Sequence, residues 1–285
     1  MNKAAVLERL YHLDLLPGEF PGFAVTCAYP ERIPKVAERF DKIIDFDHKP
    51  RVKGGYVLRK GLFRGIEVGA VNAGMYGSAT VCLEELARLG CHSILRSGTC
   101  ATLRADINCG DVIINTAAVR LDGATDHYVM PGYPAVAHPE VVMAMIQAAE
   151  NLGIRYHVGI GASTAGFYVP QGRPGANGYL PPKAKTLIAE LTDCGVLDFE
   201  GQASSHFVLG ALYGFRAGAV LSVMINRITG ETGSLELEER AISVTLEAIT
   251  ILAEWDVKKK QQAKPLFYPA LHHLAAQPDT GGKTT

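Results

Sequence analysis

Several features that mark common functional classes are missing from this sequence of 285 residues. No apolar run approaches the roughly 18 residues that a helix needs to cross a bilayer, and the formal net charge of −1 offers no basic surface for nucleic acid. The six cysteines form no C-x-x-C pair, so neither a metal site nor a redox motif is indicated. We therefore expect a cytoplasmic protein with reduced, buried cysteines, no membrane span and no nucleic-acid partner.

The sequence motifs of several enzyme classes are missing as well. The chain contains no G-x-S-x-G nucleophile elbow, no Walker loop, no H-E-x-x-H and no complete G-x-G-x-x-G. Serine hydrolases, P-loop nucleotide hydrolases, zinc proteases and dinucleotide-binding dehydrogenases are therefore not indicated. Because the histidines are scattered along the chain, no metal site is expected either.

What the sequence does contain is a regular alternation of strand-like and helix-like segments. This alternation is typical of an α/β protein whose sheet is covered on both faces, and no linker or repeat divides the chain. We expect a single domain over residues 1–285, with a frayed tail at about 277–285. The predicted strands are Phe23–Cys27, Ile66–Asn72, a segment through Ile94 and Leu95, Asp111–Val119, Tyr156–Ser163, Val196–Phe199 and Ala217–Asn226. The predicted helices are Ile33–Phe40, Ala79–Leu89, Pro139–Leu152, Lys183–Thr192, a segment from about Glu200 and Leu235–Trp255.

A candidate anion site follows one of these strands, where Arg96 stands close to Thr99. The segment Ser97–Thr99 is predicted to be a tight turn that leaves the strand. A buried arginine is costly unless an anion neutralises it, and a hydroxyl with free backbone amides would complete a small oxyanion site. The alternative is a surface arginine beside a strand end.

Three further arginines occupy similar places: Arg173 and Arg227 follow predicted strands, and Arg32 lies at a strand-to-helix turn. Ligands of open α/β sheets bind at such edges. Together with Arg96, these side chains could hold a phosphate and a second anionic or amide group. The alternative is that they are solvated and unrelated.

Specific stretches carry a resemblance to a known family, and their order and spacing extend from about Tyr11 to the last helix. The stretches are Tyr11–Leu13, Pro30–Arg32, Arg96–Thr99, Gly110–Val112, Ala118–Gly123, Tyr133–Ala137, Phe167-Tyr168 with Gln171 and Arg173, and Asn226-Arg227. On these stretches the chain resembles the nucleoside phosphorylase family, in its uridine phosphorylase branch. The resemblance implies a three-layer α/β/α domain with a central mixed sheet, and a homo-oligomer that is a dimer or a hexamer (a trimer of dimers). It also implies inorganic phosphate as co-substrate, with no cofactor.

The resemblance also implies a role for individual residues. Arg96, Gln171 and Arg173 would be the catalytic residues. His12 would reach the ribose in a neighbouring subunit, and Lys60 would likewise serve a neighbour's phosphate. The implied phosphate-binding residues are Ala28, Arg32, Lys60, Arg96 and Thr99, the base-binding residues are Phe167, Gln171, Arg173 and Arg227, and the ribose-binding residues are His12, Glu200, Gly201 and Gln202.

The chain departs from the family pattern at several of these positions. Ala28-Tyr29 replaces Gly-Asp, and Ala101 replaces a glycine. The family's Glu-Met-Glu becomes Glu200-Gly201-Gln202, so an amide stands where a carboxylate would hold the ribose 2′-hydroxyl. We therefore expect slow turnover of uridine and weak discrimination between ribose and 2′-deoxyribose. The alternative is that Gln202 only caps its helix.

The implied activity is pyrimidine salvage by phosphorolysis, most simply of uridine and phosphate to uracil and ribose 1-phosphate. The purine branch carries an aspartate near the base, whereas the matching position here is Asn226-Arg227, which favours a pyrimidine. Two alternatives stay open, namely a nucleosidase that uses water and a homologue that binds a nucleoside without turnover. Joint retention of Arg32, Arg96 and Thr99 argues against both, because neither needs three phosphate ligands.

Overall fold

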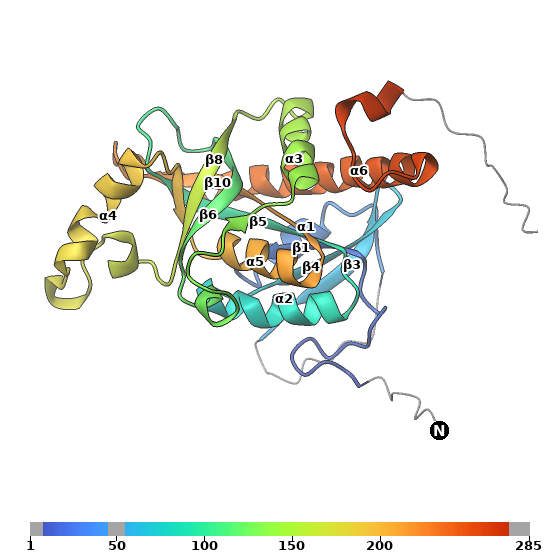
Figure 1. The fold of residues 1–285 in the computed structure, drawn as a ribbon, viewed down its shortest axis with the longest axis horizontal. Helices are drawn as coiled ribbons and strands as arrows, with labels where there is room; N and C mark the ends of the chain where they lie inside the picture. Colours follow the sequence, from blue (N-terminus) through green and yellow to red (C-terminus); the bar gives the residue numbers. More distant parts are fainter. Residues whose placement is uncertain (1–7, 45–54, 274–285) are drawn as a thin grey trace, which may run out of the picture.

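The structure, a computed structural model, describes residues 8–44 and 55–273, so the tail expected at 277–285 lies outside the described residues. Strands and helices alternate along the chain as the sequence predicted (Figure 1). The strands are β1 (Phe23–Cys27), β2 (Lys42–Ile43), β3 (Leu58–Phe63), β4 (Ile66–Asn72), β5 (Ser93–Thr102), β6 (Val112–Leu121), β7 (Ala135–Val136), β8 (Tyr156–Thr164), β9 (Asp198–Glu200) and β10 (Arg216–Asn226). The α-helices are α1 (Arg32–Ala37), α2 (Ala79–Arg88), α3 (Pro139–Asn151), α4 (Pro182–Asp193), α5 (Ala203–Tyr213) and α6 (Glu238–Gln262).

The strands form one mixed sheet, as the resemblance implied. β4, β1, β5 and β10 run parallel to one another, whereas β3 pairs antiparallel with β4 and β6 pairs antiparallel with β10. Because β10 pairs with both β5 and β6, the strands β10, β6, β8, β9 and β5 close into a ring. β9 runs antiparallel to β5, with Asp198 opposite Thr102, and the chain enters α5 soon after β9 ends.

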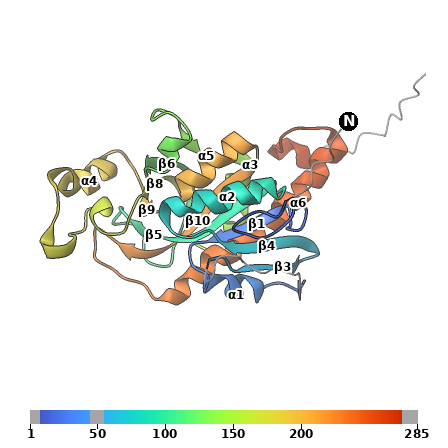
Figure 2. The same ribbon diagram turned by 90° about the horizontal axis from the view of Figure 1, so that it is seen from below.

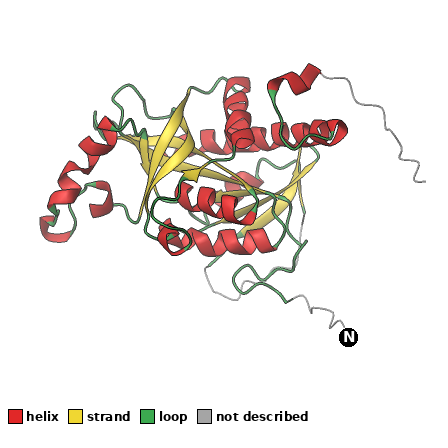
Figure 3. Ribbon diagram, in the orientation of Figure 1, coloured by secondary structure: helices red, strands yellow, loops and turns green. Residues whose placement is uncertain are grey.

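Helices cover both faces of the sheet (Figures 2 and 3). Side chains of β1 alternate between the two faces and contact different helices. Phe23, Val25 and Cys27 belong to an apolar cluster with α1 and α6, whereas Ala24 packs in a second cluster with α2 and α5. α3 packs on α6, and α4 lies at one end of the molecule. The α/β/α layering is therefore confirmed. Over the described ranges, no helix combines the length and the hydropathy needed to cross a bilayer.

The predicted turn at Ser97–Thr99 is wrong, because β5 runs through it to Thr102. Residues of this stretch are paired with β10, and Gly98 lies opposite Leu221. A Cβ at Gly98 would lie 2.8 Å from a Leu221 methyl carbon and 2.9 Å from the Arg96 guanidinium carbon. Gly98 is therefore a point of close approach within a strand, which a glycine also permits.

Other sequence expectations need smaller corrections. Strand β3 was not predicted, because its residues Arg59, Lys60 and Gly61 interrupt the apolar alternation. The last helix begins at Glu238, after a 3₁₀ turn at Leu235–Leu237, and continues to Gln262. The cysteines are free, and Cys27, Cys82, Cys91 and Cys100 are buried as expected, whereas Cys194 is exposed.

Candidate active site

A pocket opens where β1, β4 and β5 approach the junction of β9 and α5. Parallel strands place their carboxyl ends at one edge, and the turns that follow them supply side chains to a common space. Tyr76 and Tyr29, which the sequence analysis did not assign to the site, also line it. The predicted site residues in its lining are Ala28, Arg32, Arg96, Thr99, Phe167, Gln171, Glu200, Gly201 and Gln202.

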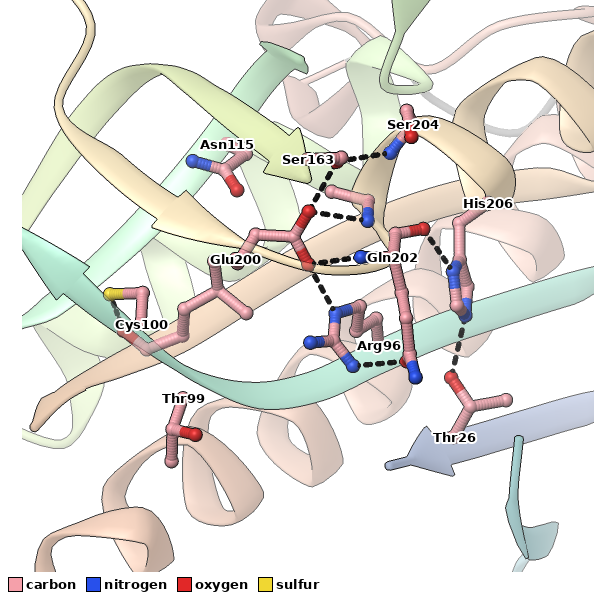
Figure 4. Close-up of polar contacts among 12 residues, drawn as sticks. Thr26, Arg96, Thr99, Cys100, Asn115, Ser163, Glu200, Gln202, Ser204 and His206 are labelled. Carbon is pink, nitrogen blue, oxygen red and sulfur yellow. Dashed lines mark hydrogen bonds and ion pairs between the residues drawn. The ribbon is translucent and has the colours of Figure 1, made fainter. Parts of the chain in front are cut away.

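Arg96 is in the lining of this pocket and is only 3% exposed, so the alternative of a surface arginine is wrong. Its Nε donates to Glu200 Oε2 at 3.0 Å, and its Nη1 donates to Gln202 Oε1 at 2.5 Å (Figure 4). A buried guanidinium requires such partners, since an unpaired charge in the interior is strongly destabilising. These two bonds fix the orientation of Arg96 before any ligand is present.

Glu200 holds Arg96 and the start of α5 in the same network (Figure 4). Its Oε2 accepts from Arg96 and from the backbone N–H of Gln202 at 2.6 Å. Its Oε1 accepts from Ser163 Oγ and from the backbone N–H of Ala203 at 2.8 Å. A carboxylate at a helix N-terminus satisfies backbone donors that lack helical partners. Both oxygens of Glu200 are thus used to organise the site.

Gln202 bridges Arg96 to the turn that follows β4. Its Oε1 accepts from Arg96, and its Nε2 donates to the carbonyl oxygen of Gly74. Gln202 occupies the N-cap position of α5, but its side chain makes no capping hydrogen bond. The alternative that Gln202 only caps its helix is therefore wrong, since the amide connects two segments of the pocket.

His206 makes hydrogen bonds next to this network, and the sequence did not identify it as a residue of the site. Its ring contacts the Gln202 carbonyl through Nδ1 at 2.9 Å and Thr26 Oγ1 through Nε2 at 2.8 Å. Because a carbonyl can only accept, Nδ1 carries the proton and Nε2 accepts from the hydroxyl. Burial, and next the charge of Arg96, lower the pKa of His206 to about 3. His206 is therefore neutral, and it holds the backbone of Gln202, the residue that accepts a hydrogen bond from Arg96.

Arg32 and Thr99 form the second basic corner of the pocket. Arg32 Nη2 donates to Thr99 Oγ1 at 3.4 Å, and Arg32 Nε pairs with Glu238 at 2.7 Å. Glu238, from the start of α6, also receives Lys35 at 2.5 Å. Arg32 and Lys35 thus share a single carboxylate at this corner, which leaves it suited to an anion.

Phe167 and Gln171 also line the pocket, and Arg173 contacts both of them. Gln171 is buried; its Nε2 donates to Thr164 Oγ1 at 3.0 Å, and its Oε1 accepts from Arg173 Nη1 at 2.5 Å. The Arg173 guanidinium lies 4.0 Å above the centroid of the Phe167 ring. Arg227 Nη1 donates to the Gln171 carbonyl at 2.9 Å.

One nitrogen of the Arg173 side chain indicates a place for a ligand. Its Nη2 is buried and has no hydrogen-bond partner among the described residues. Burial, followed by the nearby charge of Arg227, lowers the pKa of Arg173 to about 10. An unsatisfied buried N–H costs free energy, and a carbonyl group that accepts from it would remove this cost.

A second buried carboxyl lies behind the pocket. Asp198 Oδ1 accepts from Asn115 Nδ2 at 2.8 Å, whereas Asp198 Oδ2 is buried without a hydrogen-bond partner among the described residues. Burial raises the pKa of Asp198 to about 8, and the charge of Glu200 acts in the same direction. Asp198 is thus protonated near neutral pH, and no sequence motif marked it.

Comparison with known proteins follows from this geometry. Residues 23–254 match the family model described as the phosphorylase superfamily. The chain belongs to the phosphorylase superfamily. It is 39% identical over 262 residues to a uridine phosphorylase of Thermococcus kodakarensis, which covers 92% of this chain and 93% of the relative. It is 34% identical to a uridine phosphorylase of Haemophilus influenzae (85% of this chain, 98% of the relative). It is 32% identical to that of Escherichia coli (84% and 96%).

Four residues that the resemblance implied for the site are not in the lining of this pocket: His12, Lys60, Arg173 and Arg227. Arg173 and Arg227 are hydrogen-bonded to the lining residue Gln171, whereas His12 and Lys60 have partners elsewhere. His12 Nδ1 lies 2.8 Å from Glu85 Oε1, with the His12 side chain 36% exposed. Lys60 Nζ donates to the carbonyl oxygen of Glu19 at 3.1 Å. The place of His12 and Lys60 outside the pocket of the same chain is compatible with the expectation that each serves a neighbour, which stays a prediction.

Proposed function

We propose that this member of the phosphorylase superfamily catalyses the phosphorolysis of a pyrimidine nucleoside, most simply of uridine and phosphate to uracil and ribose 1-phosphate. Two observations carry the proposal: a buried, pre-oriented arginine, Arg96, in the lining of the pocket, and a buried donor of Arg173 that has no partner among the described residues and belongs to a side chain bonded to the lining residue Gln171. The first suits phosphate and the second suits the carbonyl edge of a base. The relatives described as uridine phosphorylases support the same substrates.

Phosphate would lie between Arg32, Arg96 and Thr99. Arg96 has five N–H groups, and its bonds to Glu200 and Gln202 occupy Nε and one hydrogen of Nη1. The remaining donors are available to a phosphate oxygen. Binding beneath C1′ of the sugar would hold the nucleophile in line with the bond to be broken, so positioning supplies much of the rate.

Bond cleavage would then move electrons from the C1′–N1 bond into the uracil ring. A phosphate oxygen forms the new bond to C1′, where positive charge develops as the old bond breaks. The negative charge on uracil is stabilised by Arg173, whose Nη2 donates no competing hydrogen bond within the described residues. The uracil anion then takes up one proton, which balances the proton that hydrogen phosphate loses on becoming the phosphate ester. The proposed step uses phosphate as its co-substrate and needs no metal or organic cofactor.

Assembly into a homo-oligomer, a dimer or a hexamer, is part of the proposal, as are a single domain over residues 1–285 and a cytoplasmic location. Within one chain, Glu238 offsets Arg32 and Glu200 offsets Arg96. A doubly charged phosphate would therefore benefit from a further cation. Lys60 of a neighbouring subunit is the candidate that the resemblance indicates.

The test measures uracil release from uridine with and without phosphate, and identifies the sugar product. We expect release to depend on phosphate and to give ribose 1-phosphate. Arg96→Ala should cost at least about 3 kcal/mol of transition-state stabilisation, as when one partner of a buried pair is removed. Equal release in phosphate-free buffer, with free ribose as product, would instead identify a nucleosidase.

A further inference from the structure

Tyr76, in the turn between β4 and α2, lies directly against Gly201. A Cβ atom at Gly201 would be 2.7 Å from Tyr76 Cδ1 and 3.0 Å from Cε1. A Cβ at these distances does not fit unless the ring moves. Both residues line the pocket described above. The tyrosine ring thus occupies the space that a side chain at Gly201 would take.

The tyrosine of this pair has a backbone conformation that favours glycine, whereas the glycine does not. Tyr76 has a φ of 53°, in the left-handed region. A bulky residue held there costs on the order of 1–3 kcal/mol, whereas glycine adopts this region freely. Gly201 is not among the glycines with a positive φ, so its backbone does not require glycine. Gly201 is therefore explained by the room it leaves for the ring, and the strain at Tyr76 points to a function.

The surroundings of Tyr76 place it in the lining of the pocket. The turn that carries it is tied to Gln202, whose amide donates to the Gly74 carbonyl. Burial raises the pKa of the Tyr76 hydroxyl; Arg173 and Glu200 are among the charged groups close enough to influence that pKa. Tyr76 therefore lies near the segment that holds Arg96, in the lining of the pocket in which a nucleoside would bind.

We propose that Tyr76 is a specificity-determining residue whose ring forms the pocket wall over Gly201 and packs against the sugar of the bound nucleoside. The C–H face of a pentose is apolar, and an aromatic ring offers it a large, rigid contact surface. This assignment rests on the proposed function, because it places a nucleoside in the pocket. The Tyr76 ring would then provide the packing against the sugar that a side chain at residue 201 would otherwise provide.

The test is a mutant cycle of Gly201→Ala, Tyr76→Gly and the double variant, read by the KM for uridine and the KM for phosphate. Gly201→Ala should force the ring into the nucleoside space and raise the KM for uridine about tenfold, with the KM for phosphate changed less than about twofold. Tyr76→Gly should raise the KM for uridine by a similar factor through loss of the wall. In the double variant the new methyl group meets no ring, so uridine binding should be no weaker than in Tyr76→Gly alone.

Two controls sharpen the cycle. Tyr76→Phe combined with Gly201→Ala keeps the ring and should remain as impaired as Gly201→Ala. Tyr179→Gly removes a tyrosine that is 65% exposed and outside the pocket lining, and it should leave the KM for uridine unchanged. Thermal unfolding of each variant identifies any loss that comes from misfolding, and Tyr76→Leu replaces Tyr76→Gly if the glycine variant does not fold.

The outcomes separate this assignment from the proposed function. Additive effects of Tyr76→Gly and Gly201→Ala in an enzyme that phosphorolyses uridine would overturn the role of Tyr76 alone. If the enzyme transfers the sugar to an acceptor other than phosphate, the same mutant cycle can be measured from the dissociation constants of uridine, by calorimetry without phosphate. A wild-type chain that neither binds nor cleaves uridine would refute the proposed function instead.

Discussion

Replacing Gln202 by glutamate exchanges one NH₂ group for an oxygen in the bridge that joins Arg96 to the Gly74 carbonyl. The Gly74 carbonyl would lose its donor and face an oxygen, at a cost of about 1–3 kcal/mol. Arg96 would then lie between two carboxylates, that of Glu200 and the new one, and would offer less positive charge to phosphate. A loss of 1.4 kcal/mol in binding corresponds to about a tenfold change in affinity.

We therefore expect Gln202→Glu to raise the KM for phosphate about tenfold, and to lower the midpoint of thermal unfolding by a few degrees. Initial rates of uracil release over a phosphate series at saturating uridine measure the first effect. Gln147→Glu, at an exposed position of α3, adds the same charge outside the pocket and should change neither quantity. A gain in turnover of uridine over 2′-deoxyuridine, with an unchanged KM for phosphate, would refute the bridge and support a direct contact of residue 202 with the sugar.

Three further predictions concern the buried acid, the base contact and the subunit contact. Asp198→Asn should raise the unfolding midpoint at pH 7 but not at pH 4, because the folded-state pKa of about 8 lies above the ordinary 3.8 and stability is lost as pH rises through this window; the exposed Asp193→Asn is the control, and equal effects at both pH values would contradict the assignment. Gln171→Ala should raise the KM for uridine by the equivalent of about 1–3 kcal/mol and leave that for phosphate unchanged; inosine as the better wild-type substrate would count against this pocket. Mixing inactive His12→Ala and Arg96→Ala chains under subunit exchange should restore activity in hybrid sites, and no recovery would exclude a shared site.

The layered α/β/α fold could be predicted because its signal is local. Each strand and helix has an apolar pattern that can be recognised within its own residues, and the order of these patterns along the chain indicates the fold class. The clustering of Arg32, Arg96 and Thr99 at one sheet edge followed from the same reasoning, since strand ends of a parallel sheet converge. The structure brings these three residues to a single pocket.

What the sequence could not show depends on contacts between distant segments. Gln202 meets Gly74 across 128 residues, and His206 meets Thr26 across 180, so no local pattern marks either pair. Gly98 was misinterpreted for the same reason. A glycine that permits a turn and one that admits a neighbouring side chain look alike until the neighbour, here Leu221, is known.

The position of β5 between β1 and β10 has a consequence for the newly made chain. β1 and β4 precede β5, but β10 begins only at Arg216 and pairs with β5 along nearly its whole length. On the ribosome, β5 therefore waits on the order of ten seconds for its second neighbour. A strand with an unpaired edge and apolar side chains can pair with another chain, which leads to aggregation. Chains truncated before Arg216 should accordingly be insoluble, and the nascent protein depends on rapid completion or on a chaperone that covers this edge.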